Sequence, residues 1–313
     1  MPARKPLQIR RARPSDKEAV LEFCRFTWQE HGDYIQKVWD EWVKDRKGFF
    51  AVATLEGEPM ATAKLTVLGP GEMWLEGLRV NASYRGMGTS RVMTRFLLGK
   101  ARKLRAKTVR FATGEENRVS KHVGRELGFK LLGHYSIMSA SADGRCRSVF
   151  SPVFSPRGVR REANTDDMVS IVSASYFARA MRLLASEGWT FVQVDGDFIL
   201  DSLRRRELFV ARRPGPSAPA RLGFLVASRG RAGTRLNAKL FADIDKGALY
   251  SMILGTRRLA YELELPRVRL VVPKTRKLLA TAEQAGFQED DPGFYHGVME
   301  KRLSSGRQVL VKD

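Results

Sequence analysis

A glycine turn at residues 85–90 constrains the fold of this chain more than any other feature. The turn reads Arg85-Gly86-Met87-Gly88-Thr89-Ser90 and follows residues 75–80, which have the pattern of a β-strand. An amphipathic helix comes next, with apolar residues at i, i+3, i+4 spacing: Met93, Phe96, Leu97, Ala101 and Leu104. Glycine lets the backbone approach a ligand closely, and the helix start directs its N–H groups and positive dipole end to one point. The sequence therefore predicts a phosphate-binding turn between a strand and a helix.

The elements after this helix are also distinctive. A β-type run at 108–112 precedes Asn117, and a short helix then ends in Leu127-Gly128-Phe129. Over residues 7–139 this order resembles the GNAT superfamily of N-acetyltransferases, whose signature R/Q-x-x-G-x-G/A aligns with residues 85–90. Ser90 departs from the final Gly/Ala by a small-for-small change. Asn117 matches an asparagine that is common on the family's second conserved helix.

The resemblance implies an α+β (mixed α/β) GNAT fold, a twisted mixed sheet flanked by helices, with acetyl-CoA as co-substrate. It implies backbone contacts to the cofactor from the strand before the turn, and further contacts from the turn and the second helix. The cofactor-binding residues expected on this basis are Leu78, Arg79, Val80, Arg85, Gly86, Met87, Gly88, Thr89, Ser90, Asn117 and Ser120.

The second half of the chain repeats the first in outline. The segment from Arg110 to Phe129 spans a strand, a helix and Gly-Phe, and the segment from Arg269 to Phe287 does the same. Such a repeat indicates a duplicated domain. We predict a catalytic domain at 1–140, a linker at 141–167 and a degenerate copy at 168–313. The second copy lacks R-x-x-G-x-G, and the carboxylates within 243–247 would repel phosphate.

Composition limits the classes of partner. The chain has 313 residues and a formal net charge of +21, but its basic residues are dispersed and form no nucleic-acid motif. No apolar run reaches the length of a membrane span, and the amino terminus lacks the apolar core of a secretory signal. The two cysteines, Cys24 and Cys146, form no disulfide framework, so we expect a cytoplasmic protein. The scattered histidines and cysteines lead us to expect no metal.

Acetyl transfer to an amine needs a base to remove a proton. Glu76 lies on the strand before the turn, two residues from Leu78 and therefore on the same face, and is our first candidate. Glu115, at the end of the adjacent strand, is the second. Many family members carry a tyrosine, which protonates the leaving thiolate, where this chain has Gly124. The sequence leaves open whether Ser120, Tyr135 or a water serves instead, or whether the thiolate leaves without a dedicated acid.

Only resemblance to a known family indicates which amine accepts the acetyl group. The aromatic segment 34–43 is either core or, as in many GNAT enzymes, the lining of an acceptor pocket. Together with the strand motif and the motif-free second half, it resembles the histidine N-acetyltransferase group. This implies a free amino acid or a similar small primary amine as acceptor, and a homodimer is an open expectation. The alternatives are a protein N-terminal or lysine acetyltransferase, and a non-catalytic acetyl-CoA-binding regulator.

Overall fold

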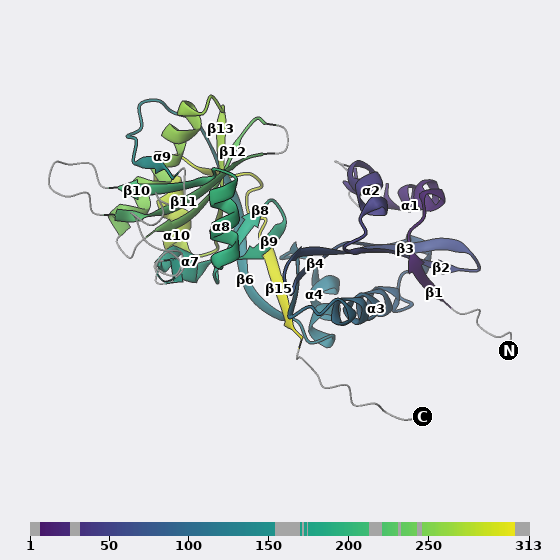
Figure 1. The fold of residues 1–313 in the computed structure, drawn as a ribbon. Coiled ribbons are helices and arrows are strands. Elements are labelled where there is room, and N and C mark those ends of the chain that lie inside the picture. Colours follow the sequence, from purple (N-terminus) through teal and green to yellow (C-terminus); the bar gives the residue numbers. More distant parts are fainter. Residues whose placement is uncertain are drawn as a thin grey trace. The chain divides into compact units, whose positions relative to one another are not determined.

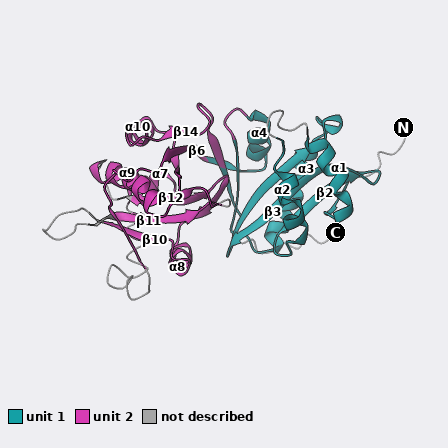
Figure 2. Cartoon of the chain, turned by 90° about the horizontal axis from the view of Figure 1, so that it is seen from above, with its two compact units in different colours: residues 1–113, 117–131, 299–313 teal, residues 114–116, 132–298 magenta. Residues whose placement is uncertain are grey.

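The chain divides into two compact units, neither of which is continuous in sequence (Figure 2). The computed structural model describes residues 7–25, 32–153, 170, 172, 173, 175–212, 221–230, 233–242 and 246–303. Unit 1 comprises residues 1–113, 117–131 and 299–313, and unit 2 comprises 114–116 and 132–298. The units therefore differ from the contiguous blocks 1–140 and 168–313 expected from the sequence. Most of the expected linker, residues 154–167, lies outside the described residues.

Unit 1 contains a twisted sheet in the order β1-β2-β3-β4-β5, with helices on both faces (Figure 1). Its strands are β1 (Gln8–Arg11), β2 (Phe49–Leu55), β3 (Glu58–Gly69), β4 (Glu72–Val80) and β5 (Thr108–Gly114). Its helical elements are η1 (Pro14–Asp16), α1 (Lys17–Cys24), α2 (Ile35–Lys44), η2 (Ala82–Tyr84), α3 (Thr89–Lys103) and α4 (Arg118–Glu126). Helices α1 and α2 cover one face of the sheet, and α3 covers the other.

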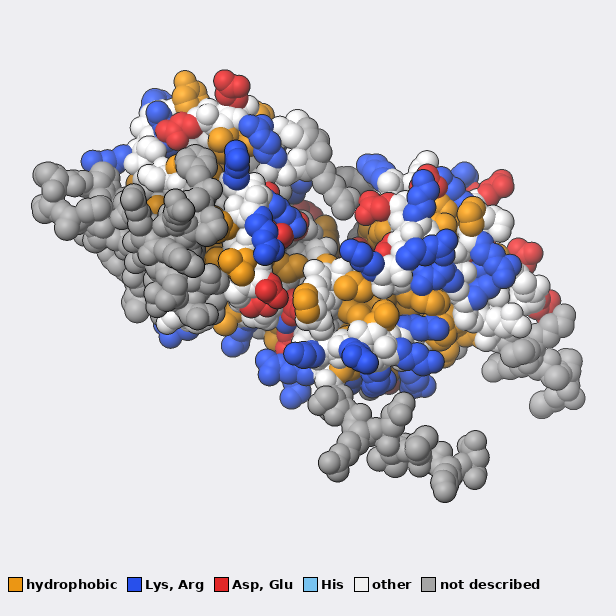
Figure 3. Space-filling model, in the orientation of Figure 1, with side chains coloured by type: hydrophobic (Ala, Val, Ile, Leu, Met, Phe, Trp, Pro, Cys, Tyr) orange, Lys and Arg blue, Asp and Glu red, His pale blue; other side chains and the backbone are white. Residues whose placement is uncertain are grey.

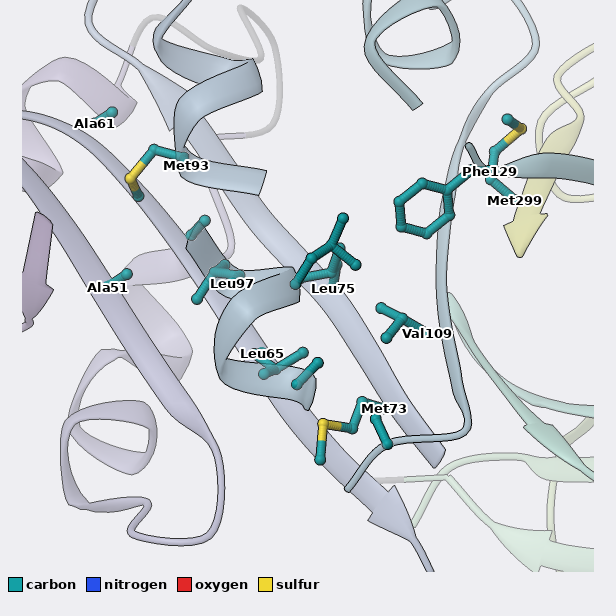
Figure 4. Packing of buried hydrophobic residues seen from close by; sticks show 14 of the residues in the cluster. Ala51, Ala61, Leu65, Met73, Leu75, Met93, Leu97, Val109, Phe129 and Met299 are labelled. Carbon is teal, nitrogen blue, oxygen red and sulfur yellow. The ribbon is translucent and has the colours of Figure 1, made fainter. Parts of the chain in front are cut away.

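Alternation along the strands gives unit 1 one core on each face of its sheet. On the α3 face, Met93 and Leu97 pack with Leu65 and Leu75 (Figure 4). On the opposite face, the aromatic side chains of α2 pack edge-on against Phe50, with ring centroids 5.0 and 5.2 Å away. The sheet of unit 1 is thus packed on both faces, with α3 on one of them and α2 on the other.

Unit 2 repeats the element order of unit 1. Its sheet runs β6-β13-β12-β11-β10-β7, and a separate hairpin pairs β8 with β9. The strands are β6 (Lys130–Ser141), β7 (Phe150–Pro152), β8 (Leu184–Glu187), β9 (Thr190–Gln193), β10 (Leu208–Arg212), β11 (Arg221–Arg229), β12 (Leu236–Ala242), β13 (Arg267–Pro273), β14 (Gln288–Glu289) and β15 (His296–Arg302). The helices are α7 (Tyr176–Ala180), α8 (Gly196–Arg204), α9 (Lys246–Glu262) and α10 (Arg276–Gln284).

Two strands are exchanged between the halves of the chain. The part of β6 after Leu131 belongs to unit 2, where it pairs antiparallel with β13 over the run from Tyr135 to Ser141. The last part of β15, from Met299 onward, belongs to unit 1 and is hydrogen-bonded to β5. Each sheet therefore requires a strand from the other half of the sequence.

A buried arginine binds strand β15 to the other strands of unit 1. Arg110 on β5 donates to Glu72 on β4 at 2.8 Å and to Glu300 on β15 at 2.7 Å. The Arg110 side chain is only 4% exposed. Because it binds one carboxylate on β4 and one on β15, Arg110 joins three strands of unit 1.

Candidate active site

The predicted turn opens α3 in a conformation that requires glycine. Gly88 is the N-cap of α3 with φ +77°, and Gly86 has φ +79°. A Cβ on either glycine would meet no atom within 4 Å. The glycines are therefore required by the left-handed backbone, not by crowding, and the space beside the turn is open.

The backbone N–H groups of this turn point to an anion site. A helix leaves its first N–H groups without internal acceptors, and the first intrahelical bonds of α3 come from Arg91 and Val92 to the Gly88 carbonyl. Within the described part of the chain, no acceptor is bound by the N–H groups of residues 86–90. Thr89 is buried, whereas Arg85 and Met87 are exposed. This cradle fits the pyrophosphate of a coenzyme A thioester.

Asn117 and Ser120 have a structural role that the sequence did not reveal. The Asn117 side chain caps α4 by accepting from the Ser120 N–H at 3.0 Å. Such a cap stabilises a helix by ~1 kcal/mol. The cap uses Oδ1, so the amide group of Asn117 can still donate. Contacts from these two residues to a cofactor stay a prediction.

Strand β4 separates from β5 after Trp74, within the strand that leads to the glycine turn. Their parallel pairing ends at Trp74 and Arg110, and no further pair joins the two strands in the described residues. The pairing of β4 with β3 also breaks, because Gly77 and Leu78 together oppose Ala63, which is a β-bulge. The parting and the bulge together leave a split in the sheet beside residues 78–80.

Gly77 permits this bulge. Its φ is +63°, and a Cβ there would lie 2.6 Å from Cζ3 of Trp42 on α2. Both the backbone conformation and the packed indole therefore exclude a side chain. Leu78 and Val80 turn their partly buried side chains to the α3 core. Their backbone at the split is where a pantetheine chain is expected.

Glu76 lies beside the bulge, half-buried on the sheet face that α2 covers. The expectation that it shares a face with Leu78 was wrong, because the bulge between them shifts the alternation by one residue. It accepts a hydrogen bond from the Thr66 hydroxyl. Its cross-strand neighbour Lys64 is 1% exposed and pairs with Asp45. Burial alone would raise the pKa of Asp45, but the hydrogen bond from Lys64 brings it below the ordinary value. The hydrogen bond from Thr66 therefore holds the Glu76 carboxylate next to the split in the sheet.

A second ion pair lies next to Glu76 and was not foreseen from the sequence. Arg79 Nε lies 2.5 Å from Asp33 Oδ2, and the two side chains are 12% and 3% exposed. The guanidinium carbon lies 5.5 Å from the ring centroid of Tyr34. Arg79 was predicted to contact the cofactor, and the structure shows that its side chain holds Asp33. The partners are 46 residues apart, so no local pattern indicates the pair.

The position of the missing tyrosine is filled by packing. A Cβ on Gly124 would lie 2.8 Å from Cζ of Phe111, so α4 cannot hold a larger residue there without moving. Tyr135, an alternative proton donor, is 1% exposed in the core of unit 2, and its ring centroid lies 5.0 Å from that of Phe191. It belongs to a different unit from the split beside Glu76.

Glu115, the second candidate base, also belongs to unit 2. Its carboxylate binds Lys274 Nζ at 2.7 Å, and His134 Nε2 lies 4.0 Å away. Its backbone N–H donates to Tyr295. The structure therefore groups Glu76 with Tyr34 and Arg79, and it groups Glu115 with residues of unit 2.

The family of unit 1 follows from this geometry and from the sequence. Residues 17–129, which include β4, the turn and α3, match the acetyltransferase (GNAT) family. The chain thus carries an N-acetyltransferase domain of the GNAT type, a class that uses acetyl-CoA as co-substrate. No protein of curated function matches the sequence.

Solved structures extend the likeness to both units. A GCN5-related N-acetyltransferase from Sphaerobacter thermophilus is similar over 96% of each chain, with 13% identity and a TM-score of 0.61. A tandem GNAT protein from the clavulanic acid biosynthesis pathway is similar over 96% of this chain and 100% of its own, with 11% identity and a TM-score of 0.55. At sequence identities this low, the likeness shows the fold alone. It extends over both units, so unit 2 has a second GNAT-like fold.

The surface outside the site shows no region of a single kind of side chain on the face in view. On the face shown in Figure 3, basic side chains are spread over both units and interleaved with apolar and acidic ones. Among the described residues, no group of three or more His, Cys, Asp or Glu is placed to hold a metal ion. None of the helices described is both long and apolar enough to span a bilayer.

Proposed function

We propose that unit 1 transfers the acetyl group of acetyl-CoA to the primary amine of a small metabolite, such as a free amino acid. The observation that carries this proposal is the continuity of the site along one strand. Glu76 and the Gly77 bulge lie on β4, and the Gly86–Gly88 turn follows it. A cofactor whose pyrophosphate binds this turn has its pantetheine led along Leu78, Arg79 and Val80 toward Glu76.

The chemistry assigned to these groups is direct attack of the amine on the thioester. Glu76 removes a proton from the attacking nitrogen, directly or through a water. In this proposal, the backbone N–H groups at the bulge stabilise the negative charge that develops on the carbonyl oxygen. Thr66 keeps the Glu76 carboxylate in position through its hydroxyl.

The partial burial of Glu76 supports a small acetyl acceptor. Glu76 is half-buried near Tyr34 at the start of α2, and Trp42 of the same helix packs on Gly77. A polypeptide acceptor needs an open groove at this place. The basic balance of the chain, +21, favours an acceptor that carries a carboxylate. We further propose that unit 2 is a degenerate copy without a cofactor site. Its Asp243 and Asp245 lie outside the described residues.

Isotope-labelled acetyl-CoA tests the proposal in a whole-cell extract of metabolites and proteins. After incubation with the protein, mass spectrometry should find label on one small amine, and the Glu76→Gln variant should leave that amine unlabelled. Label on polypeptides would contradict the small acceptor. Bound acetyl-CoA without any transfer would contradict catalysis and indicate a regulatory protein.

A further inference from the structure

One face of the sheet in unit 2 becomes polar and basic where β12 and β13 begin. The β8–β9 hairpin marks this face, because Glu187 at the end of β8 binds Lys239 on β12 at 3.0 Å. Side chains alternate along a strand, so Asn237 lies on the same face as Lys239. Arg235 lies there too, since its Nε donates to Asn237 Oδ1 at 3.2 Å. From the hairpin to the start of β12, the face therefore carries a row of polar side chains.

Strand β13 adds two arginines to this face. Arg269 is the parallel partner of Asn237, and residues paired across a sheet lie on the same face. Arg267 lies two residues earlier and therefore on the same side of the strand. Together with Arg235, these residues bring three guanidinium groups to the start of two neighbouring strands. Among the described residues, the only ion pair within this group joins Arg269 to Asp290 at 2.5 Å.

The arginine side chains are held by contacts within unit 2. Arg235 packs over Gly230, where a Cβ would lie 2.9 Å from Arg235 Cγ, so a larger residue at 230 would displace the arginine. Arg269 is fixed by Asp290, and its Nε is buried with no acceptor among the described residues. Asn237 accepts from Arg235 through its side-chain oxygen, which leaves its amide group to donate. Arg235 and Arg269 are only half-buried, so a ligand can reach donors that are already in position.

Repulsion between the guanidinium groups raises the free energy of this arrangement. The pKa of Arg235 lies below its ordinary value, because burial lowers it and Arg269 and Arg267 lower it further, against the opposing effect of Asp290. One carboxylate thus faces three cations. A bound anion would offset the repulsion that remains, so the electrostatics favour a negatively charged ligand.

We propose that Arg235, Asn237 and Arg269 bind the oxyanion group of a small ligand, a carboxylate or a phosphate. Guanidinium groups suit both, because their N–H donors form a planar fork that matches two oxygen acceptors. The site gives unit 2 a role in ligand binding, and it does not rest on the function proposed for unit 1. It is also distinct from a second cofactor site. The glycine turn of unit 1 follows the C-terminal end of β4, whereas this site lies at the N-terminal end of β12.

The Nε–H signals of the arginines in ¹H–¹⁵N NMR spectra of the full-length protein test the site directly. The signals of Arg235 and Arg269 are assigned by their loss in Arg235→Lys and Arg269→Lys, which keep the charge and remove the fork. Inorganic phosphate and citrate are titrated separately at constant ionic strength. Arg145, assigned in the same way, is the matched control, because it pairs with Asp143 in the same unit and its side chain is 92% exposed.

We expect the Nε–H signals of Arg235 and Arg269 to shift to saturation with one shared dissociation constant. In Arg235→Lys, binding read at Arg269 should be roughly tenfold weaker. The backbone amide spectrum verifies that this variant is folded. If it is not, Asn237→Ala replaces it, since that substitution keeps all three charges and should also weaken binding.

The two anions distinguish the sources of the oxyanion. Saturation by phosphate alone would assign a phosphorylated ligand to the site, and saturation by citrate alone would assign a carboxylate. Absence of saturable shifts with either anion would overturn the proposal. Equal shifts at Arg145 would overturn it as well, because they would show a general response of surface arginines to anions.

Discussion

Strands β4 and β12 hold the same place in the two units, yet only β4 has the features of an active-site strand. Each pairs in parallel with its neighbour over three residues, at 72–74 in β4 and at 236–238 in β12, and then parts from it. Strand β12 pairs with β11 in unbroken register, whereas β4 has a bulge at Gly77. Leu240 and Phe241 are buried beyond the split of β12, whereas residues 78–80 of β4 are only partly buried.

The comparison separates what the fold provides from what the site requires. A split sheet follows from the shared element order and occurs in both units. The bulge, the carboxylate beside it and the open glycine turn occur together in unit 1. In unit 2, Leu240 lies four residues after the start of the parallel pairing, as Glu76 does in unit 1, and it is 2% exposed. An apolar side chain at that strand position supplies no base.

Replacement of the proposed base should have the largest effect on catalysis. Glu76→Gln keeps the shape of the side chain but removes its basicity, so kcat should fall by roughly 10²- to 10⁴-fold. Glu115→Gln is the matched control, because Glu115 binds Lys274 in unit 2, and it should keep kcat within a few-fold. Steady-state kinetics on the amine identified by labelling measures both. A large loss in Glu115→Gln alone would reverse the assignment of the base.

Loss of the central arginine of unit 1 should have the largest effect on stability. Arg110→Met leaves Glu72 and Glu300 in the sheet without their cation, and such a loss costs about 3–5 kcal/mol. Arg269→Met in unit 2 breaks a pair with Asp290 in which both side chains are 24% exposed, so about 1 kcal/mol is expected. Denaturant unfolding compares the two. Equal losses would mean that Arg110 does not secure the exchanged strand.

The two units should lose stability in different pH ranges. Burial lowers the pKa of His296 in unit 2 to about 4 from its ordinary value of 6.5. The unfolded chain therefore binds the proton first, and stability is lost as pH falls from 6.5 toward 4, by up to about 3 kcal/mol. In unit 1 the pKa values of Asp16 and Asp45 lie below 3.8, because hydrogen bonds from Arg10 and Lys64 outweigh burial. Their contribution is lost only as pH falls below that value.

Hydrogen exchange at pH 7 and pH 4.5, followed by mass spectrometry, measures this difference peptide by peptide. Unit 2 should lose protection at pH 4.5 before unit 1 does. In the His296→Gln variant, the difference between the two units in loss of protection should become smaller, because the substitution removes the titrating group. Equal losses of protection in both units would contradict the assignment of acid sensitivity to His296.

Strain in the glycine turn should have the smallest of these effects. Gly88→Ala forces an L-residue to φ +77° at a cost of about 1–2 kcal/mol, and it moves the N–H cradle. We expect roughly tenfold weaker coenzyme A binding by calorimetry. Gly233→Ala in unit 2 imposes the same kind of strain at φ +66° in open space and should leave binding unchanged. Equal affinities would show that the turn does not hold the cofactor.

Local patterns predicted the local parts of the molecule well. The strand, the glycine turn and α3 could be predicted because helix periodicity and two glycines act within 30 residues of sequence. The exchange of β6 and β15 could not be predicted, because pairing between strands that are distant in sequence has no local signature. Arg110 and Glu300 are 190 residues apart, and Asp33 and Arg79 are 46 apart. Gly124 could be noted as a departure, but its contact with Phe111 depends on the packing of α4 on β5.

The stoichiometry of coenzyme A binding tests the central contrast between the units most directly. Isothermal titration of the full-length protein with coenzyme A should give one site per chain. Hydrogen exchange of the same complex should show new protection at the 85–90 turn and along β4, with none at β12 or at the start of α9. Two sites per chain, or protection confined to unit 2, would contradict the account.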